Sequence, residues 1–290
     1  DIFLSEDQRT RVRINGEVIP VNDSTMSRQD LIRLWEACEI DPASANEIDS
    51  RYQMKNGGYI RANLYRAMGN LSAAIRPIKA IIPPLDSLGL PTDLIRHWIH
   101  RRSGLILVTG TTGSGKSTTL ASALEELNES RQSHIITLED PIEYEHAPLQ
   151  CLIHQREVGR DTPDFESGLR AALREDPDVI LVGEMRDAAT IRLALTAAET
   201  GHLVLSTLHT ASAPQAVDRL VDAFGSHEKE AVRALFAENL IAVLAQTLCP
   251  QLGGVGRVAA HEIMVGTSAV KNLIREGKVS QLYSALQTGQ

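Results

Sequence analysis

The sequence predicts an α/β fold, a mainly parallel sheet covered by helices, preceded by a small α+β module. Two observations lead to this prediction. Between residues 104 and 208, short apolar runs alternate with segments of helical length and periodicity, and this alternation is typical of a parallel sheet. Residues 1–77 instead combine strand-like alternation of apolar and polar residues with short helical segments, as in an α+β module.

The length and composition are those of two folded domains. The chain has 290 residues, of which 43% are hydrophobic and 23% charged. A single hydrophobic core stops growing near ~250–300 residues, and disordered chains are more polar and more highly charged. We therefore expect one large domain and one small one.

The charge and the cysteine content indicate which class of partner and which cellular compartment to expect. The formal net charge is −8 without a long Lys/Arg run, so no nucleic acid is expected as the main partner. Cys38, Cys151 and Cys249 are scattered, which is typical of a reducing, cytoplasmic compartment. The longest apolar runs have strand length, whereas a membrane helix needs about 20 residues. No signal peptide is visible, and we expect no direct membrane insertion.

The first module is predicted to contain a hairpin, two short helices and further strands. The stretch "TRVRINGEVIPV" alternates around Asn15-Gly16, a strong hairpin signal. Residues 27–48 suggest two helices, the first capped by Ser27 and the second opened by Pro42. The stretches "GGYIRANLYR" and "LSAAIRPI" return to strand spacing.

Prolines mark the boundary between the two parts. The stretch "KAIIPPLDSLGLP", residues 79–91, holds two adjacent prolines and a third, which favours an extended, stiff connector. We predict an N-terminal domain over 1–80, a proline-rich linker over 81–92 and a second domain over 93–290.

The second domain is predicted to alternate regularly up to residue 208. The expected strands are "LILVT", "HIITL", "VILV" and "HLVLSTL", and the expected helices are 115–129, 165–175 and 187–199. From about residue 213 the pattern predicts a largely helical C-terminal part. The chain starts at Asp1 without Met and stops after "LQTGQ", from which we expect an excised fragment with a truncated C-terminus.

The stretch "GTTGSGKS" satisfies the phosphate-loop pattern GxxxxGK[ST]. It follows a predicted strand and opens a predicted helix, the context in which backbone N–H groups and a helix N-terminus surround a phosphate. Lys116 is expected to reach the outer phosphates of ATP, and the Ser117 hydroxyl to coordinate Mg²⁺. The predicted nucleotide-binding residues are Thr112, Gly113, Ser114, Gly115, Lys116, Ser117 and Thr118.

Acidic residues follow two of the predicted strands. Glu184 comes after "VILVG", and Glu139, Asp140 and Glu143 come at and after the end of "HIITL". Ligands of parallel α/β sheets bind at the carboxyl ends of the strands, so these acids are expected on the phosphate-loop side. Any one of them could equally be a solvated loop acid.

Two histidines flank another strand. His202 and His209 lie at the two ends of "HLVLSTL", and His209 emerges at the carboxyl end, near the expected γ-phosphate. It could donate a hydrogen bond to that phosphate, or it could be a capping or core histidine. The sequence holds no HExxH motif or Cys/His cluster, which disfavours a zinc site of that kind.

Four motifs in order resemble those of a known family. "GTTGSGKST", "TLEDPIEY", "LREDPDVILVGEMRD" and "TGHLVLSTLHT" closely resemble the Walker A, Asp box, Walker B and His box of the secretion-superfamily ATPases, the hexameric motors of type II secretion and type IV pili. The stretch "AVKNLIREGK", 269–278, is similar to the AIRNLIREGK signature of the retraction branch, from which Val270 and Lys271 depart. The paired CxxC zinc module of the assembly and secretion branches is not expected, because only Cys249 lies in the corresponding region.

The resemblance implies a PAS-like N-terminal domain, a RecA-like ATPase core and a homohexamer. Mg-ATP would bind the phosphate loop, with Ser117, Glu184 and Asp140 holding the metal directly or through water. Glu143 or Glu139 would polarise the attacking water. The track would be an inner-membrane platform protein that the motor touches at the cytoplasmic face.

The resemblance also implies that N-terminal arginines complete a neighbour's site. Arg61 and Arg76 match the family's positions. A third expected arginine is Met68 here, so either Arg66 substitutes for it or the chain presents fewer cations to the phosphates. Thr247 also stands where relatives often have arginine.

Several alternatives stay open at this point. An assembly or secretion motor, or an accessory retraction motor, would carry the same motifs. A nucleotide-gated scaffold with little hydrolysis is a function of another class. A RecA-like nucleic-acid motor would show DNA binding with a steep salt dependence.

Overall fold

The structure, a computed structural model, describes residues 1–14, 17–54, 59–78, 81–253 and 256–288. The Asn15-Gly16 turn of the predicted hairpin lies outside these residues. The chain divides into two compact units, 1–81 and 82–290, and each is described by itself.

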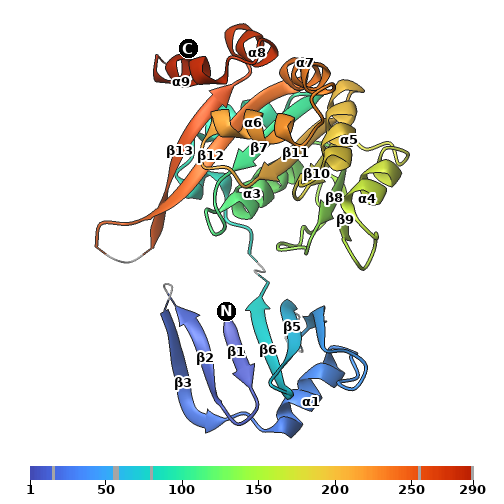
Figure 1. Cartoon of the computed structure of the whole chain (residues 1–290), viewed down its shortest axis with the longest axis vertical. Helices are drawn as coiled ribbons and strands as arrows, with labels where there is room; N and C mark the ends of the chain where they lie inside the picture. The colour runs from blue at the N-terminus through green and yellow to red at the C-terminus, as the bar shows by residue number, and fades with distance from the viewer. Residues whose placement is uncertain (15–16, 55–58, 79–80, 254–255, 289–290) are drawn as a thin grey trace. The chain divides into compact units, whose positions relative to one another are not determined.

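The first unit is an antiparallel sheet with one helix packed on it. The strand order is β3-β2-β1-β6-β5-β4, and Figure 1 labels the first five of these strands in that order. The bounds are β1 Ile2–Ser5, β2 Arg9–Ile14, β3 Glu17–Thr25, α1 Arg28–Ala37, β4 Glu47–Gln53, β5 Tyr59–Ala67 and β6 Asn70–Pro77. This is the α+β arrangement that the sequence predicts.

Helix α1 begins where the sequence predicts. The Ser27 hydroxyl accepts a hydrogen bond from the Asp30 N–H, and the Asp30 carboxylate accepts one from the Ser27 N–H. This capping box satisfies N–H groups that a helix N-terminus would otherwise leave unpaired. Leu31 and Trp35 on the buried face of α1 are fully buried and belong to the same apolar cluster as Leu64. Burying such side chains contributes about 1.5–3 kcal/mol each.

The predicted second helix of the first module is wrong. Pro42 lies in a turn, in which the Asp41 carboxylate accepts the Ala43 N–H and the Asp41 carbonyl accepts the Ser44 N–H. A short aspartate side chain that binds the backbone two residues later favours a turn over a helix. Strand β4 then begins at Glu47, because its backbone pairs with β5 along its whole length.

The second unit contains the predicted parallel sheet, in the order β13-β12-β7-β11-β10-β8-β9. Among the described residues of this sheet, only the β12–β13 pair is antiparallel. The strands are β7 Gly104–Thr109, β8 His134–Glu139, β9 Leu152–Glu157, β10 Val179–Val182, β11 Leu203–Leu208, β12 Leu240–Pro250 and β13 Arg257–Val265. The helices are η1 Leu85–Leu88, α2 Thr92–Ile99, α3 Lys116–Ser130, α4 Phe165–Ala172, α5 Ala188–Glu199, α6 Ala213–Asp222, α7 Lys229–Asn239, α8 Ser268–Arg275 and α9 Val279–Gln287.

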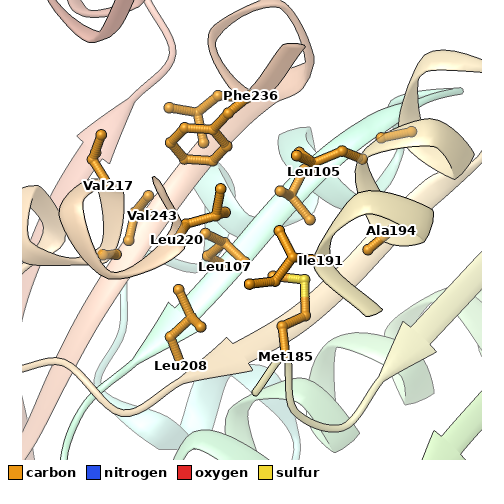
Figure 2. Close-up of a cluster of buried hydrophobic side chains, with 14 of the residues drawn as sticks. Leu105, Leu107, Met185, Ile191, Ala194, Leu208, Val217, Leu220, Phe236 and Val243 are labelled. Carbon is orange, nitrogen blue, oxygen red and sulfur yellow. The ribbon is translucent and has the colours of Figure 1, made fainter. Parts of the chain in front are cut away.

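Alternating side chains of the sheet enter two separate cores. Leu105 and Leu107 of β7 face a cluster that includes Ile191 of α5 and Phe236 of α7, as Figure 2 shows. Ile106 and Val108 belong to the opposite cluster, which α2 and α3 cover. A strand that is buried on both faces reads as a continuous apolar run, which is why β7 was recognisable in the sequence.

The prediction of a mainly helical C-terminal part is wrong in one respect. Helices α6 to α9 are present, but β12 and β13 lie between them, and β12 pairs in parallel with the central strand β7. The stretch "LIAVLAQTL" has an apolar run that fits a buried helix as well as a strand. Pairing with β7 decides between the two.

The predicted linker differs from an extended connector. From Ile82 onward the chain belongs to the second unit, and η1 lies within it. Leu85 and Leu90 are buried in the core beside α3, and the Pro83 carbonyl accepts a hydrogen bond from the Ser122 hydroxyl at 2.7 Å. The proline-containing segment is therefore packed on the second unit.

The first unit is expected to depend on the packing of its single helix against its sheet. Leu64→Ala removes a fully buried side chain and should lower the unfolding free energy by about 2–5 kcal/mol. Denaturant unfolding followed by Trp35 fluorescence in a Trp98→Phe background measures this. Val21→Thr, at an exposed position of β3, is the control and should change the value by less than about 0.5 kcal/mol. Equal unfolding curves for the two variants would contradict this account of the core.

Candidate functional site

The turn from β7 into α3 forms a phosphate-loop backbone. β7 ends at Thr109, α3 begins at Lys116, and Gly115 is its N-cap with φ 94°. A Cβ at Gly110, whose φ is 146°, would overlap the Gln246 carbonyl and the Ser114 hydroxyl. A Cβ at Gly115 would lie 2.7 Å from Gln246 Nε2. Both positions therefore need glycine for space as well as for backbone conformation.

Gln246 of β12 holds this loop from the other side. Its Nε2 donates to the Ser114 carbonyl at 2.8 Å, and its Oε1 accepts from the Thr119 hydroxyl at 2.9 Å. The Gln246 side chain is buried, where the effective dielectric is low and hydrogen bonds are strong. One side chain thus ties the loop and the first turn of α3 to the strand beside β7.

Lys116 lies along the loop. Its Nζ donates to the carbonyl oxygens of Gly110 at 2.8 Å and Thr111 at 3.1 Å, and the side chain is buried. Burial lowers the pKa of the Lys116 ammonium, and the negative charges of Glu184 and Glu143 partly oppose this effect. The sheet therefore brings both acidic groups within electrostatic reach of the phosphate-loop lysine.

The loop has the features of an anion site. No side chain caps the N-terminus of the 15-residue helix α3, so its first N–H groups and its dipole are directed at the loop. Within the described part of the chain, the buried Ser114 hydroxyl has no hydrogen-bond partner. Gly113 has no atom within 4 Å of where a Cβ would lie. These groups fit the phosphates of a nucleotide.

Glu184 and His209 are brought together by neighbouring strands. Glu184 follows β10 and His209 follows β11, and these strands pair in parallel. His209 Nε2 lies 3.4 Å from Glu184 Oε1, while the other carboxylate oxygen of Glu184 accepts from Arg186 Nε at 2.8 Å. The Glu184 side chain is 19% exposed. His202, at the other end of β11, binds the Ala197 carbonyl and has a capping role.

The acids after β8 differ in their surroundings. Glu139 is half-buried, whereas Asp140 and Glu143 are exposed. Glu139 Oε1 accepts from the Thr137 hydroxyl at 2.6 Å and from Gln155 Nε2 at 3.2 Å. Burial raises the pKa of Glu139, and these hydrogen bonds partly counteract it. The structure thus holds the Glu139 carboxylate in place and leaves the other two in the solvated segment.

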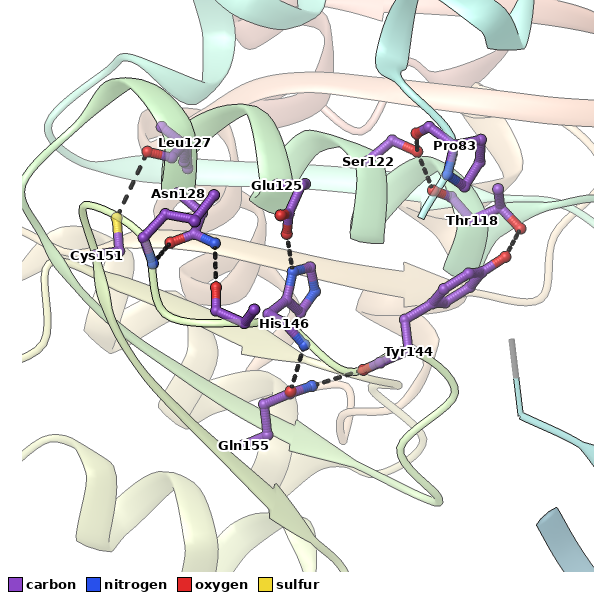
Figure 3. Close-up of polar contacts among 12 residues, drawn as sticks. Pro83, Thr118, Ser122, Glu125, Leu127, Asn128, Tyr144, His146, Cys151 and Gln155 are labelled. Atoms are coloured by element: carbon purple, nitrogen blue, oxygen red, sulfur yellow. Dashed lines mark hydrogen bonds and ion pairs between the residues drawn. The ribbon is translucent and has the colours of Figure 1, made fainter. Parts of the chain in front are cut away.

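Polar contacts join this acidic segment to α3, as Figure 3 shows. The Tyr144 hydroxyl lies 2.8 Å from Thr118 Oγ1. His146 Nδ1 lies 2.7 Å from Glu125 Oε2. Thr118 and Glu125 lie on α3, the helix that begins at the phosphate loop. The acidic segment and the loop are therefore both attached to α3.

The two predicted arginines lie in the first unit. Arg61 of β5 and Arg76 of β6 are directly opposite each other in the antiparallel pair. Arg61 binds the Asp49 carboxylate at 3.1 Å and Arg76 binds that of Asp1 at 2.8 Å. Like charges directly across a strand pair are destabilising, and the two carboxylates offset this.

Arg66 is bound within the first unit. Its guanidinium donates to the carbonyls of Pro42 at 2.7 Å and Gly69 at 3.2 Å, so it stabilises the end of the hairpin. Met68 lies at the tip, with φ 52° and full exposure. Both alternatives that the sequence leaves open, Arg66 as a substitute or fewer cations, concern the phosphates of a neighbouring subunit and stay predictions.

Comparison with known proteins decides the family. The sequence profile described as "Type II/IV secretion system protein" matches residues 82–280. The chain belongs to this family. The Pseudomonas aeruginosa protein described as "Type IV pilus retractation ATPase PilT" is 47% identical over 294 residues, which cover 100% of this chain and 85% of that protein. The "Twitching motility protein" of Neisseria gonorrhoeae is 44% identical over 96% of this chain and 76% of its own length.

A solved structure extends the similarity to three dimensions. The crystal structure of "the Pilus Retraction Motor PilT and Bound ADP" matches with a TM-score of 0.91 and 42% identity, over 99% of this chain and 85% of that one. The α/β core with its small N-terminal module is therefore the fold of this branch of the secretion family. The resemblance of the four motifs to those of the secretion-superfamily ATPases is confirmed.

Two side chains of this secretion-family site were missed as site residues by sequence reasoning. Gln246 contacts the phosphate loop across 132 positions of the sequence, and Gln155 contacts Glu139 across 16. A lone glutamine inside a strand carries no chemical signature. Recognising β9 and β12 as strands next to β8 and β7 would have placed both residues near the loop.

Gln246→Leu is expected to weaken nucleotide binding. The Ser114 carbonyl and the Thr119 hydroxyl would lose their partner, which costs about 1–2 kcal/mol, or roughly 5–30-fold in affinity for ATP if the loop deformation falls on the binding step. Titration calorimetry with ATP measures this. Thr247→Val, at the exposed neighbouring position, is the control. Unchanged ATP affinity in a folded Gln246→Leu protein would show that this clamp is dispensable for binding.

Proposed function

We propose that this chain is an ATP-hydrolysing motor that powers type IV pilus retraction. The observation that carries the proposal is the full-length similarity to the pilus retraction ATPase PilT, 47% identical over 100% of this chain, together with a phosphate loop surrounded by acidic groups. The retraction-like stretch "AVKNLIREGK" forms α8 and the turn after it, which supports retraction over assembly or secretion. The similarity to a protein described by its role in twitching motility points the same way.

Mg-ATP would bind the loop from Thr112 to Thr118. The uncapped N-terminus of α3, the buried Ser114 hydroxyl and Lys116 fit its phosphates. Ser117 and the carboxylates of Glu184 and Asp140 would hold Mg²⁺ directly or through water. When bound, the metal neutralises charge that develops on the β- and γ-phosphate oxygens.

The acids and the histidine would have separate roles. Glu139 or Glu143 would orient and polarise the attacking water. His209 would donate a hydrogen bond to the terminal phosphate, and its contact with Glu184 would make its position depend on what the Glu184 carboxylate binds. Loss of the terminal phosphate would then change the contacts of His209 after β11 and of Glu184 after β10.

Arg61 and Arg76 would complete the site of a neighbouring subunit in a homohexamer. An arginine supplied this way stabilises charge on the transferring phosphoryl group and is worth about 10³–10⁵ in rate in related phosphate-loop enzymes. Their adjacent positions on β5 and β6 would present two cations together. Hydrolysis would therefore require contact between subunits, and closure of a domain on ATP followed by relaxation would drive the stroke.

The motor would work in the cytoplasm, at the face of the inner membrane, on a pilus platform protein. Among the described residues no helix is long and apolar enough to span a bilayer. A platform partner in the membrane would supply the attachment. Neither a nucleic acid nor insertion into the lipid is part of the proposal.

Two inactive variants are expected to restore each other's activity. Glu184→Gln and the double variant Arg61→Ala/Arg76→Ala should each lower ATP turnover at least about 100-fold. Mixed subunits should recover up to about a quarter of wild-type turnover, because one interface in four pairs an intact Glu184 with intact arginines. Steady-state phosphate release at high protein concentration measures this.

The control for the mixing experiment is Arg9→Ala/Arg33→Ala, which removes two exposed arginines of the same unit and should keep wild-type turnover. No recovery on mixing, with exchange of subunits verified, would place the arginines in their own chain's site. Equal turnover of wild type and Glu184→Gln would end the motor proposal in favour of a scaffold.

Deletion of the gene is expected to leave cells with more surface fibres and no twitching motility, because assembly continues without retraction. Fibre counts by electron microscopy and surface motility assays measure this. Wild-type chain should restore motility and Glu184→Gln should not. Loss of fibres would assign the chain to assembly, and an unchanged count with normal motility would leave an accessory role or another system.

A further inference from the structure

The side-chain amide of Gln155 joins three parts of the site. It lies on β9 and is half-buried. Its Oε1 accepts the His146 N–H at 3.0 Å, and its Nε2 donates to the Tyr144 carbonyl at 2.8 Å and to Glu139 Oε1 at 3.2 Å. Backbone N–H and C=O groups have fixed roles, so they also determine which way the amide is turned.

The Gln155 amide therefore acts on both candidate acids. Its contact with Glu139 is direct. Glu143 lies one residue before Tyr144, directly next to the stretch that the amide holds at Tyr144 and His146. Losing the amide would remove one hydrogen bond each from the Glu139 carboxylate, the Tyr144 carbonyl and the His146 N–H.

The same segment is anchored on the phosphate-loop helix. The Tyr144 hydroxyl contacts Thr118, two residues after Lys116. His146 contacts Glu125, seven residues further along α3. Figure 3 shows Gln155 below His146 and Tyr144, with these two side chains reaching up to α3. Gln155 thus stands between Glu139 and the helix that begins at the loop.

We propose that Gln155 is a positioning residue for the hydrolytic step: it aligns Glu139 directly, and Glu143 through Tyr144 and His146, with the phosphate loop. The inference rests on the proposed ATP hydrolysis and adds to it a residue that none of the four motifs contains. Gln155 itself would touch neither ATP nor the attacking water.

Burial and neighbouring groups act on Glu139. The charge of Glu143 raises the pKa of Glu139, as burial does more strongly. From β9, the Glu157 carboxylate is bound to the Ile142 N–H, and Arg156 pairs with Glu175. Hydrogen bonds from Thr137, Gln155 and the Glu143 backbone lower the pKa of Glu139. The Gln155 amide is thus one of three groups that hold the Glu139 carboxylate by hydrogen bonds.

The test compares Gln155→Leu and Gln155→Glu with Asn128→Leu. Asn128 is a buried amide that holds the far end of the same segment, donating to the Ala147 carbonyl at 2.7 Å and accepting from the Leu149 N–H at 3.1 Å. Within the described residues, the Asn128 side chain makes no hydrogen bond to Glu139. It is therefore the matched control for loosening the segment without changing the surroundings of the carboxylate.

Both Gln155 variants of the assembled full chain are expected to lose at least ~10-fold in kcat at pH 7. Their ATP affinity should stay within about 3-fold, because Gln155 does not contact the loop. The loss should therefore appear in kcat and not in the affinity for ATP. Asn128→Leu should leave both values near those of wild type.

Each other outcome overturns the inference. If wild type hydrolyses ATP and the Gln155 variants keep its kcat, or lose no more of it than Asn128→Leu does, Gln155 does not position the acids. If neither Gln155 variant folds by circular dichroism while Asn128→Leu does, its role is structural. If wild type itself turns over no faster than Glu184→Gln, the proposed function fails and this inference with it, a result that the first outcome cannot produce.

Discussion

The site depends on one short turn, in which the chain leaves a buried strand and enters a helix with no side chain in the way. Gly110 and Gly115 leave room for the carbonyl and amide of Gln246, which a Cβ at either position would displace. Gln246 in turn fixes the Ser114 carbonyl and the Thr119 hydroxyl. The N–H groups of α3 are thereby directed at the point where an anion can bind.

The order of strands then decides which acids surround that point. β7 lies between β12 and β11, and β10 and β8 follow, so the carboxyl ends of four parallel strands meet at one edge. Glu184, His209 and Glu139 all come from these ends. The negative charges of Glu184 and Glu143 act on the Lys116 ammonium. The positive charge of this buried lysine and the charges of these acids therefore partly compensate one another in the absence of a bound nucleotide and metal.

The two units contribute unequal chemistry. The second carries the loop, the acids and the histidine within one rigid sheet, whereas the first carries Arg61 and Arg76 as a pair of like charges on neighbouring strands. Such a pair has no benefit for the stability of the sheet. Aspartates hold both guanidinium groups, so these cations would have to exchange partners to serve a phosphate, which suits an interaction made only during part of a working cycle.

The sequence by itself determined the class of fold, the loop and the acids at the strand ends. Those features are local: an apolar run of strand length, glycines at set spacing, and a carboxylate directly after a strand. Tertiary structure alone decided that 240–250 is the strand beside β7 and that the proline segment packs on α3. It also decided that Arg66 serves the hairpin and that two glutamines hold the site, because each of these outcomes depends on a partner distant in the sequence, and local patterns do not encode which partner wins.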